Sequence, residues 1–111
     1  TITHSEAERR MAKWLKKMDR IALDDVDNIA EYIARDSLYY AQLFVQKIFQ
    51  SVRRLTTFPE SGRKVPEIGR NEIREIIVGN YRIIYRSQKQ VIEILTVYHS
   101  SKLLNKDFID N

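Results

Sequence analysis

A stretch near the C-terminus of the sequence, GNYRIIYRSQKQVIEILTVYHS at 79–100, gathers side chains that could surround a phosphate. It contains two strand-like runs joined by a polar turn, and its residues of interest are Tyr81, Arg82, Tyr85, Arg86, Tyr98 and His99. An arginine fork matches phosphate oxygens, and histidine is the easiest general acid or base near neutral pH. The stretch therefore indicates either ordinary strand residues or a phosphate site at the end of a hairpin.

Three β-rich runs predict the sheet that would hold these residues. They are IREIIV at 73–78, YRIIYR at 81–86 and VIEILTVY at 91–98. Gly79-Asn80 is a two-residue hairpin signal between the first two runs, and residues 87–90 join the second run to the third. Connections this short predict an antiparallel meander.

Two amphipathic stripes upstream predict a helical hairpin. The first stripe is Ala22, Val26, Ile29 and Ile33, and the second is Ala41, Phe44, Val45, Ile48, Val52 and Leu55. Asp36-Ser37 can end the first helix and cap the next, and Phe58-Pro59 stops the second. We expect helices at about 21–34 and 37–56, then a loop at 59–71. The fold class would be α+β, with a helical hairpin packed on one face of a small antiparallel β-sheet.

The first residues of the sequence carry a local helix signal. Ser5 and Glu8 fit a capping box, and Met11, Trp14, Leu15 and Met18 follow at helical spacing. Local pattern alone therefore predicts a helix over residues 5–18.

Composition limits the kind of protein. The 111 residues suit a single domain, and the absence of cysteine excludes disulfides and thiolate metal sites. His4 and His99 lie far apart, so we expect no metal and no cofactor. We find no bilayer-spanning run and no signal peptide, and we expect a cytoplasmic protein with no membrane partner. Residues 19–36 carry six acids and two bases, whereas residues 47–106 carry twelve bases and five acids. The basic half favours an anionic partner such as nucleic acid.

Four fragments in order, LDDVDNIAEYIA, RLTTFPESGR, EIREIIVGNYRIIYR and IEILTVYHSSKLL, resemble the RelE/ParE superfamily of toxins from type II toxin–antitoxin systems. The resemblance covers roughly residues 13–104, which makes residues 1–12 an N-terminal extension. It implies a RelE/ParE-like fold and a cognate antitoxin that wraps the toxin. It also implies a short strand at about 13–18 that joins the sheet, in conflict with the local helix signal.

The superfamily has two modes of action, and the resemblance supports both. RelE-like toxins cleave mRNA on the ribosome without a metal, which requires a base, a proton donor and cations around the scissile phosphate. By resemblance, Arg82 would bind that phosphate with Arg74, and His99 would be the acid or base. ParE-like toxins instead poison DNA gyrase, and FPESGR and YHSSKLL look more like that branch. The strand IREIIV also carries Glu75 where RelE-like toxins place lysine.

We therefore expect a toxin, and the leading hypothesis is that it acts as an mRNA interferase. The alternative is inhibition of gyrase, and the third hypothesis is a toxin-like remnant without activity. Arg63, Lys64, Arg86 and Lys102 would add contacts to nucleic acid, although a solvated loop also explains the first two. Strand alternation places Tyr81 and Tyr85 on a core face and Arg82 on the other. The meander predicts that Arg82 meets His99, whereas Arg74 needs its long stem to join them.

Apolar side chains suggest where an antitoxin would bind. Trp14, Phe44 and Phe108 are large aromatics for one small core, and we expect at least one at an exposed apolar patch. Residues 103–109 would form one end of an antitoxin groove, in which a helix would use apolar anchors.

Overall fold

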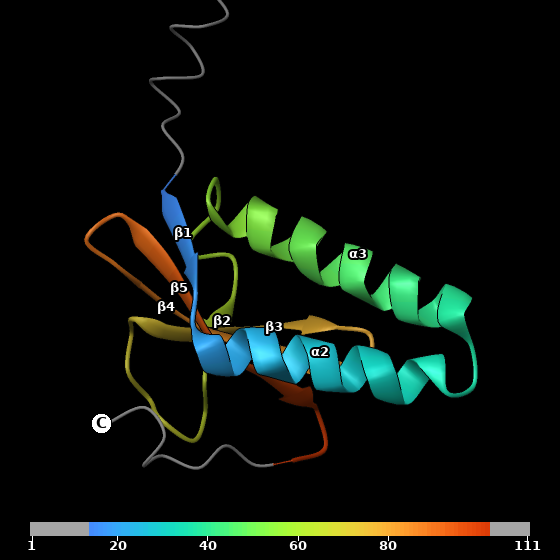
Figure 1. Cartoon of the computed structure of the whole chain (residues 1–111). Coiled ribbons are helices and arrows are strands. Elements are labelled where there is room, and N and C mark those ends of the chain that lie inside the picture. Colours follow the sequence, from blue (N-terminus) through green and yellow to red (C-terminus); the bar gives the residue numbers. More distant parts are fainter. Residues whose placement is uncertain (1–13, 103–111) are drawn as a thin grey trace, which may run out of the picture.

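The computed structural model describes residues 14–102, which form two helices and five strands (Figure 1). In chain order they are β1 Leu15–Met18, α2 Arg20–Ala34, α3 Leu38–Leu55, β2 Arg63–Lys64, β3 Ile73–Val78, β4 Tyr81–Gln88 and β5 Val91–His99. The strands make one sheet in the order β1-β5-β4-β3-β2, and both helices lie on one of its faces. The predicted α+β architecture is confirmed. None of the helices in residues 14–102 is long and apolar enough to cross a bilayer.

The meander formed by β3, β4 and β5 is confirmed. The turn at Gly79 and Asn80 pairs Val78 with Tyr81 and Ile77 with Arg82, as its length predicts. Gly79 has a positive φ of 59°, which glycine adopts without a steric penalty. Strand β4 continues two residues past the predicted end, because β5 remains paired with it as far as Gln88.

The helical hairpin is also confirmed. Ser37 caps α3, and its hydroxyl accepts a hydrogen bond from the Tyr40 amide at 3.2 Å. Arg53 and Arg54 lie in the last turn of α3, where cations complement the helix dipole. The apolar stripes of both helices pack on the covered face of the sheet, and the buried members of this core are Ala22, Val26, Phe44, Ile48, Val52, Leu55, Ile83, Tyr85, Ile92, Ile94 and Val97.

The N-terminal conflict is decided in favour of a strand. Strand β1 runs parallel to β5 at the edge of the sheet, with Leu15 opposite Val91 and Met18 opposite Ile94. The Trp14 amide also donates to the carbonyl of Thr56 at 2.7 Å. The predicted helix is therefore wrong for residues 14–18, because pairing with the sheet satisfies the backbone and outweighs the local helical spacing. Residues 5–13 lie outside the described residues.

The sheet has a second face, which we call the open face because α2 and α3 leave it uncovered. A smaller buried cluster lies there, made of Val65, Ile73, Ile84 and Leu95, with Ile68 and Tyr98 packed against it. Leu95 reaches this face through a bulge, because Ile84 pairs with Thr96 and Tyr85 pairs with Ile94. The loop between β2 and β3 supplies Val65 and Ile68, and the same loop carries Glu67 to the open face.

Candidate functional site

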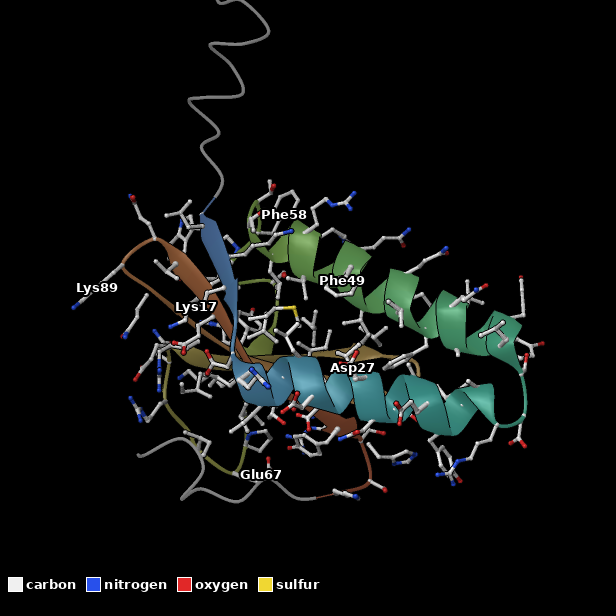
Figure 2. All side chains as sticks on the ribbon, in the orientation of Figure 1. Lys17, Asp27, Phe49, Phe58, Glu67 and Lys89 are labelled. Carbon is white, nitrogen blue, oxygen red and sulfur yellow. The ribbon has the colours of Figure 1, made fainter. Side chains whose placement is uncertain are left out.

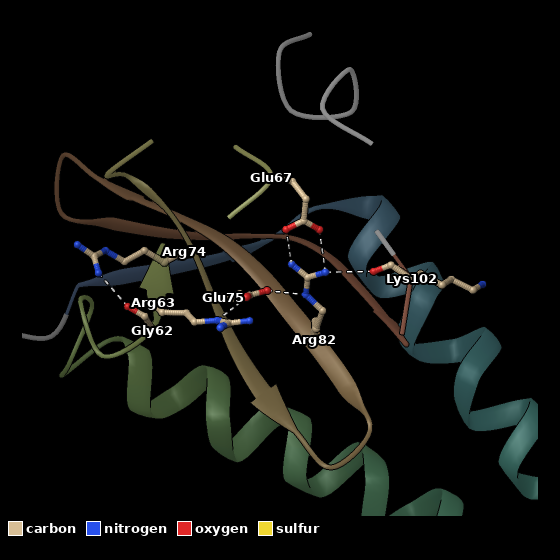
Figure 3. A network of polar contacts seen from close by, with 7 residues as sticks. All are labelled: Gly62, Arg63, Glu67, Arg74, Glu75, Arg82 and Lys102. Atoms are coloured by element: carbon tan, nitrogen blue, oxygen red, sulfur yellow. Dashed lines mark hydrogen bonds and ion pairs between the residues drawn. The ribbon is translucent and has the colours of Figure 1, made fainter. Parts of the chain in front are cut away.

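Arg82 lies on the open face and is buried, with 5% of its surface exposed. Its two terminal nitrogens bind the two oxygens of the Glu67 carboxylate at 3.0 and 3.1 Å. Its Nε donates to Oε2 of Glu75, and Nη1 also donates to the carbonyl of Lys102 at 3.1 Å (Figure 3). Two acids and a backbone carbonyl therefore surround the guanidinium that the sequence assigns to a phosphate.

Glu75 connects this arginine to a second one. The Glu75 side chain is fully buried, and its other oxygen accepts from Nε of Arg63 at 2.7 Å. The four side chains Arg63, Glu67, Glu75 and Arg82, which we call the open-face ion network, carry two positive and two negative charges. Arg82 is therefore part of the buried structure, because the network needs it to neutralise a buried carboxylate.

Electrostatics hold Arg82 in its charged form. Burial disfavours the charged guanidinium, but the hydrogen bonds to Glu67 and Glu75 outweigh it and raise the pKa of Arg82 above its usual value. Tyr98 lies beside it, with the Arg82 guanidinium carbon 5.2 Å from the ring centroid. Burial, aided by the two carboxylates, raises the pKa of Tyr98 to about 12. The hydroxyl of Tyr98 is buried and has no hydrogen-bond partner within residues 14–102.

His99 lies apart from this network. It pairs with Tyr81 in the β4–β5 ladder, and the two rings meet edge to face with centroids 5.6 Å apart. Its Nδ1 lies 2.8 Å from the Ser101 hydroxyl. Arg82 pairs instead with Tyr98, so the alternation of side chains places Arg82 and His99 on opposite faces. The predicted cluster of Arg82 with His99 is therefore wrong by one residue of register.

Arg74 also points away from Arg82. It pairs with Tyr85, whose side chain belongs to the core under the helices. Its Nη1 donates to the carbonyl of Gly62 at 2.8 Å (Figure 3). Its Nη2 donates to Oδ1 of Asn71. Its Nε is buried without a partner among the described residues. The long stem of Arg74 therefore leads to the β2 end of the sheet and not to the predicted phosphate site.

The predicted nucleic-acid contacts are scattered. Arg63 and Lys64 are both exposed on β2, while Arg86 is paired with Glu93 at 3.2 Å on the far part of β4. Lys102 borders a hollow of about 490 Å³ that Arg63, Glu67, Ile77 and Arg82 also line. Glu67 thus fills the place in this hollow where an anion would meet Arg82. No group of three or more His, Cys, Asp or Glu side chains in the described part of the chain is arranged to hold a metal ion.

Comparison with known proteins identifies the family. The family model described as the ParE toxin of the type II toxin–antitoxin system parDE matches residues 17–104. The chain belongs to the ParE toxin family. It is thus a toxin of the type II toxin–antitoxin class, within the superfamily that the sequence resembles. A search of curated proteins finds no match.

Two solved structures show that this ParE-family fold recurs at low sequence identity. A chain from "Chromosomal ParDE TA system from P. aeruginosa" is 22% identical with a TM-score of 0.65, and the match covers 78% of this chain and 96% of that one. A chain from the RelBE2 toxin–antitoxin complex of Mycobacterium tuberculosis is 16% identical with a TM-score of 0.59, and the match covers 83% and 97% respectively. At these identities the likeness shows the fold alone.

The apolar surface of this ParE-family toxin differs from the expected one. The sequence predicts that at least one of Trp14, Phe44 and Phe108 lies at an exposed apolar patch, and Phe44 is not that residue, because only 8% of its surface is exposed. Trp14 is half-buried and borders a hollow of about 430 Å³ that Phe58 shares, and Phe58 is 59% exposed. We call this hollow the Trp14–Phe58 hollow. Phe108 and residues 103–109 lie outside the described residues.

Sequence reasoning missed the acids of the open-face ion network. Glu75 was noticed only as an acid in place of a lysine, and Glu67 lies in a loop with no periodic pattern. One signal was available. In a hairpin that turns at Gly79-Asn80, Ile77 lies opposite Arg82, and Glu75 is two residues before Ile77, so Glu75 and Arg82 lie on the same face of adjacent strands. Nothing in the sequence near Glu67 indicates that its loop folds back over β4.

Proposed function

We propose that this toxin arrests growth by docking on a protein target, DNA gyrase, without cleaving any bond. The observation that carries the proposal is the occupied Arg82 fork. Glu67 binds both of its terminal nitrogens and Glu75 binds its Nε. A phosphate would have to displace Glu67 and then lie beside the buried carboxylate of Glu75, which carries the same sign of charge.

The remaining requirements of the nuclease mechanism find no support in the geometry. Metal-free cleavage needs an acid, a base and cations that converge on one phosphate. Arg82, His99 and Arg74 point to three different places, and the open-face ion network has no net charge with which to attract an anion. Cleavage of mRNA on the ribosome therefore becomes the alternative that an experiment must exclude.

We further propose that a cognate antitoxin neutralises the toxin and that both work in the cytoplasm. The superfamily resemblance supports this, and the two similar structures come from a ParDE system and a RelBE2 toxin–antitoxin complex. The Trp14–Phe58 hollow supplies an apolar site for an antitoxin anchor, because large aromatic side chains are enriched at protein–protein interfaces.

Two assays run side by side test the mode of action. The purified toxin is added to a gyrase supercoiling reaction and to a cell-free translation reaction in which mRNA 5′ ends are mapped. We expect loss of supercoiling with intact mRNA, and the purified antitoxin should restore supercoiling. New mRNA ends within codons together with normal supercoiling would contradict the proposal and restore the nuclease hypothesis.

A further inference from the structure

The tip of the helical hairpin carries a group of large apolar side chains that are exposed within residues 14–102. Tyr32, Leu38, Tyr39 and Tyr40 flank the turn between α2 and α3 and are 66%, 65%, 67% and 63% exposed. We call residues 30–46 the hairpin tip. In Figure 1 the turn between α2 and α3 extends beyond the strands of the sheet, whereas Phe44, further along α3, is buried and meets the Tyr81 ring of β4. Exposed aromatic and leucine side chains that cluster in this way indicate a binding surface.

A groove runs between the two helices at the hairpin tip. It has a volume of about 680 Å³ and is lined by Ala30, Ala34, Ala41, Val45, Leu38 and Glu31 among others. The small alanine side chains leave the space between the helix axes unfilled. A groove of this kind accepts an apolar side chain or one face of a helix from a partner.

The exposed tyrosines contact neighbouring side chains. Tyr39 and Tyr40 meet edge to face, with ring centroids 5.3 Å apart. On the other side of the turn, the Arg35 guanidinium carbon lies 5.9 Å from the Tyr32 ring centroid. Aromatic rings have few rotatable bonds and a large apolar area, so these rings suit contact with a partner.

Charge distinguishes the kind of partner. Residues 21–46 carry five acids and one base, although the whole chain has a net charge of +4. Asp27, which is labelled in Figure 2, and Glu31 lie one turn apart on α2, and both are exposed. Neither has an ion-pair partner in the part of the chain that the structure describes. The ten residues from Ser37 to Gln46 include no charged side chain. Glu31 therefore gives the groove an acidic side chain on its α2 rim, Asp27 lies one turn before it, and the α3 rim is neutral.

We infer that the hairpin tip is the surface that docks on the toxin's protein target, and that the target contributes an apolar segment flanked by lysine or arginine. The apolar side chains would enter the groove, and the basic ones would pair with Asp27 and Glu31. This inference rests on the proposed function, since it names the surface through which a non-enzymatic toxin holds its target. The tip lies at the opposite end of α3 from Phe58 and the Trp14–Phe58 hollow (Figure 2). A residue change at the tip should therefore leave the antitoxin in place.

Two substitutions test the tip without harming the fold. Leu38→Glu removes an exposed apolar anchor at the first position of α3, where an acidic side chain suits the helix dipole. Glu31→Lys reverses the charged rim in the last turn of α2, where a cation suits the dipole. Ile21→Glu is the matched control, because Ile21 is also a half-exposed apolar residue in the first turn of a helix and lies far along α2 from the tip.

The measurements are gyrase supercoiling by purified protein and growth arrest on induction, with antitoxin copurification as the test of folding. We expect Leu38→Glu and Glu31→Lys each to raise the half-inhibitory concentration by about tenfold or more, as loss of an interface hot spot does. Ile21→Glu should stay within about twofold of the wild type, and all three variants should copurify with the antitoxin.

Different failures have different meanings. If both tip variants inhibit supercoiling and arrest growth like the wild type, the inference is wrong while the proposed function stands. Loss of antitoxin copurification in the tip variants alone would assign the tip to the antitoxin and also overturn the inference. If the wild type leaves supercoiling intact, gyrase is not the target. Loss of growth arrest in the tip variants alone would then still support the tip as the docking surface.

Discussion

The open face of the sheet and the hairpin tip differ in whether their side chains are buried and paired within the chain or exposed. On the open face, Arg82 and Glu75 are buried, but each charge is paired within the chain. At the hairpin tip, Leu38 and three tyrosines are exposed. Glu31 on the groove rim, and Asp27 one turn before it, have no ion-pair partner among residues 14–102. A buried charge that is paired within the chain belongs to the fold. An exposed apolar surface is available to a partner. We therefore expect the toxin to contact its target through the tip of α2 and α3 and not through Arg82.

Removal of Arg82 should have the largest effect. Arg82→Ala leaves the buried carboxylate of Glu75 without its main partner, and breaking such a pair costs about 3–5 kcal/mol of unfolding free energy. Urea denaturation of the purified variant measures the loss. Arg20→Ala is the control, because the side chains of Arg20 and its partner Asp24 are 89% and 58% exposed and the pair should contribute less than about 1 kcal/mol. Equal stabilities of the two variants would remove the distinction between a structural ion and a surface ion.

Glu67→Gln should have an intermediate effect. The amide keeps one acceptor for Arg82 but loses the charge that makes the two bonds at 3.0 and 3.1 Å strong. We expect a loss of about 1–2 kcal/mol in the same denaturation experiment. Growth arrest should remain, because the open face does not act on the target in this account. A gain of mRNA cleavage in this variant would instead show that Glu67 masks a phosphate site.

Asp19→Asn should give a small effect that depends on pH. Burial, a hydrogen bond with Glu93 and repulsion from that residue raise the pKa of Asp19 from 3.8 to about 6. The folded state therefore favours the protonated carboxyl, and this stabilisation is complete below pH 3.8 and is lost as the pH rises through about 6. Asparagine mimics the neutral form, so the variant should be more stable than the wild type at pH 7 by less than about 1 kcal/mol, and equal to it near pH 4. Melting temperatures at the two pH values check this, and a gain at pH 4 alone would reverse the assigned sign.

The smallest stability change is expected at the hairpin tip. Leu38→Glu should alter the free energy of unfolding by no more than about 0.5 kcal/mol, because Leu38 is 65% exposed and packs little. Denaturation beside the Arg82→Ala variant makes the comparison direct. A large loss for Leu38→Glu would mean that the tip is part of the core and would weaken its assignment as a binding surface.

The elements of the fold could be predicted because their signals are local. Gly79-Asn80 fixes the first hairpin and its register, and the stripe that contains Phe44 and Ile48 fixes the buried face of α3. Residues 15–18 show the limit of this reasoning, since their helical spacing gives way to pairing with β5. That pairing depends on residues more than seventy positions away, and no local pattern contains it.

The candidate site was harder to predict, for two physical reasons. A shift of one position decides which face a strand residue occupies, so Tyr98 and not His99 lies beside Arg82. A loop can also bring a charge from outside the pattern, as the loop between β2 and β3 does with Glu67. The family resemblance correctly indicated a toxin, but only the contacts of Arg82 show that its guanidinium is already bound.

The most direct test of this account replaces the buried ions together. A triple variant with Arg82→Met, Glu67→Leu and Glu75→Leu removes the fork and both of its carboxylates, and apolar substitutes of similar size often preserve the stability of such a cluster. The measurement is the growth rate after induction, at protein levels matched to the wild type and with antitoxin copurification as the folding control. We expect full growth arrest, because Arg82 is a structural ion and the toxin docks through its helices. A folded variant that still binds the antitoxin but no longer arrests growth would show that Arg82 acts on the target, and would contradict the account.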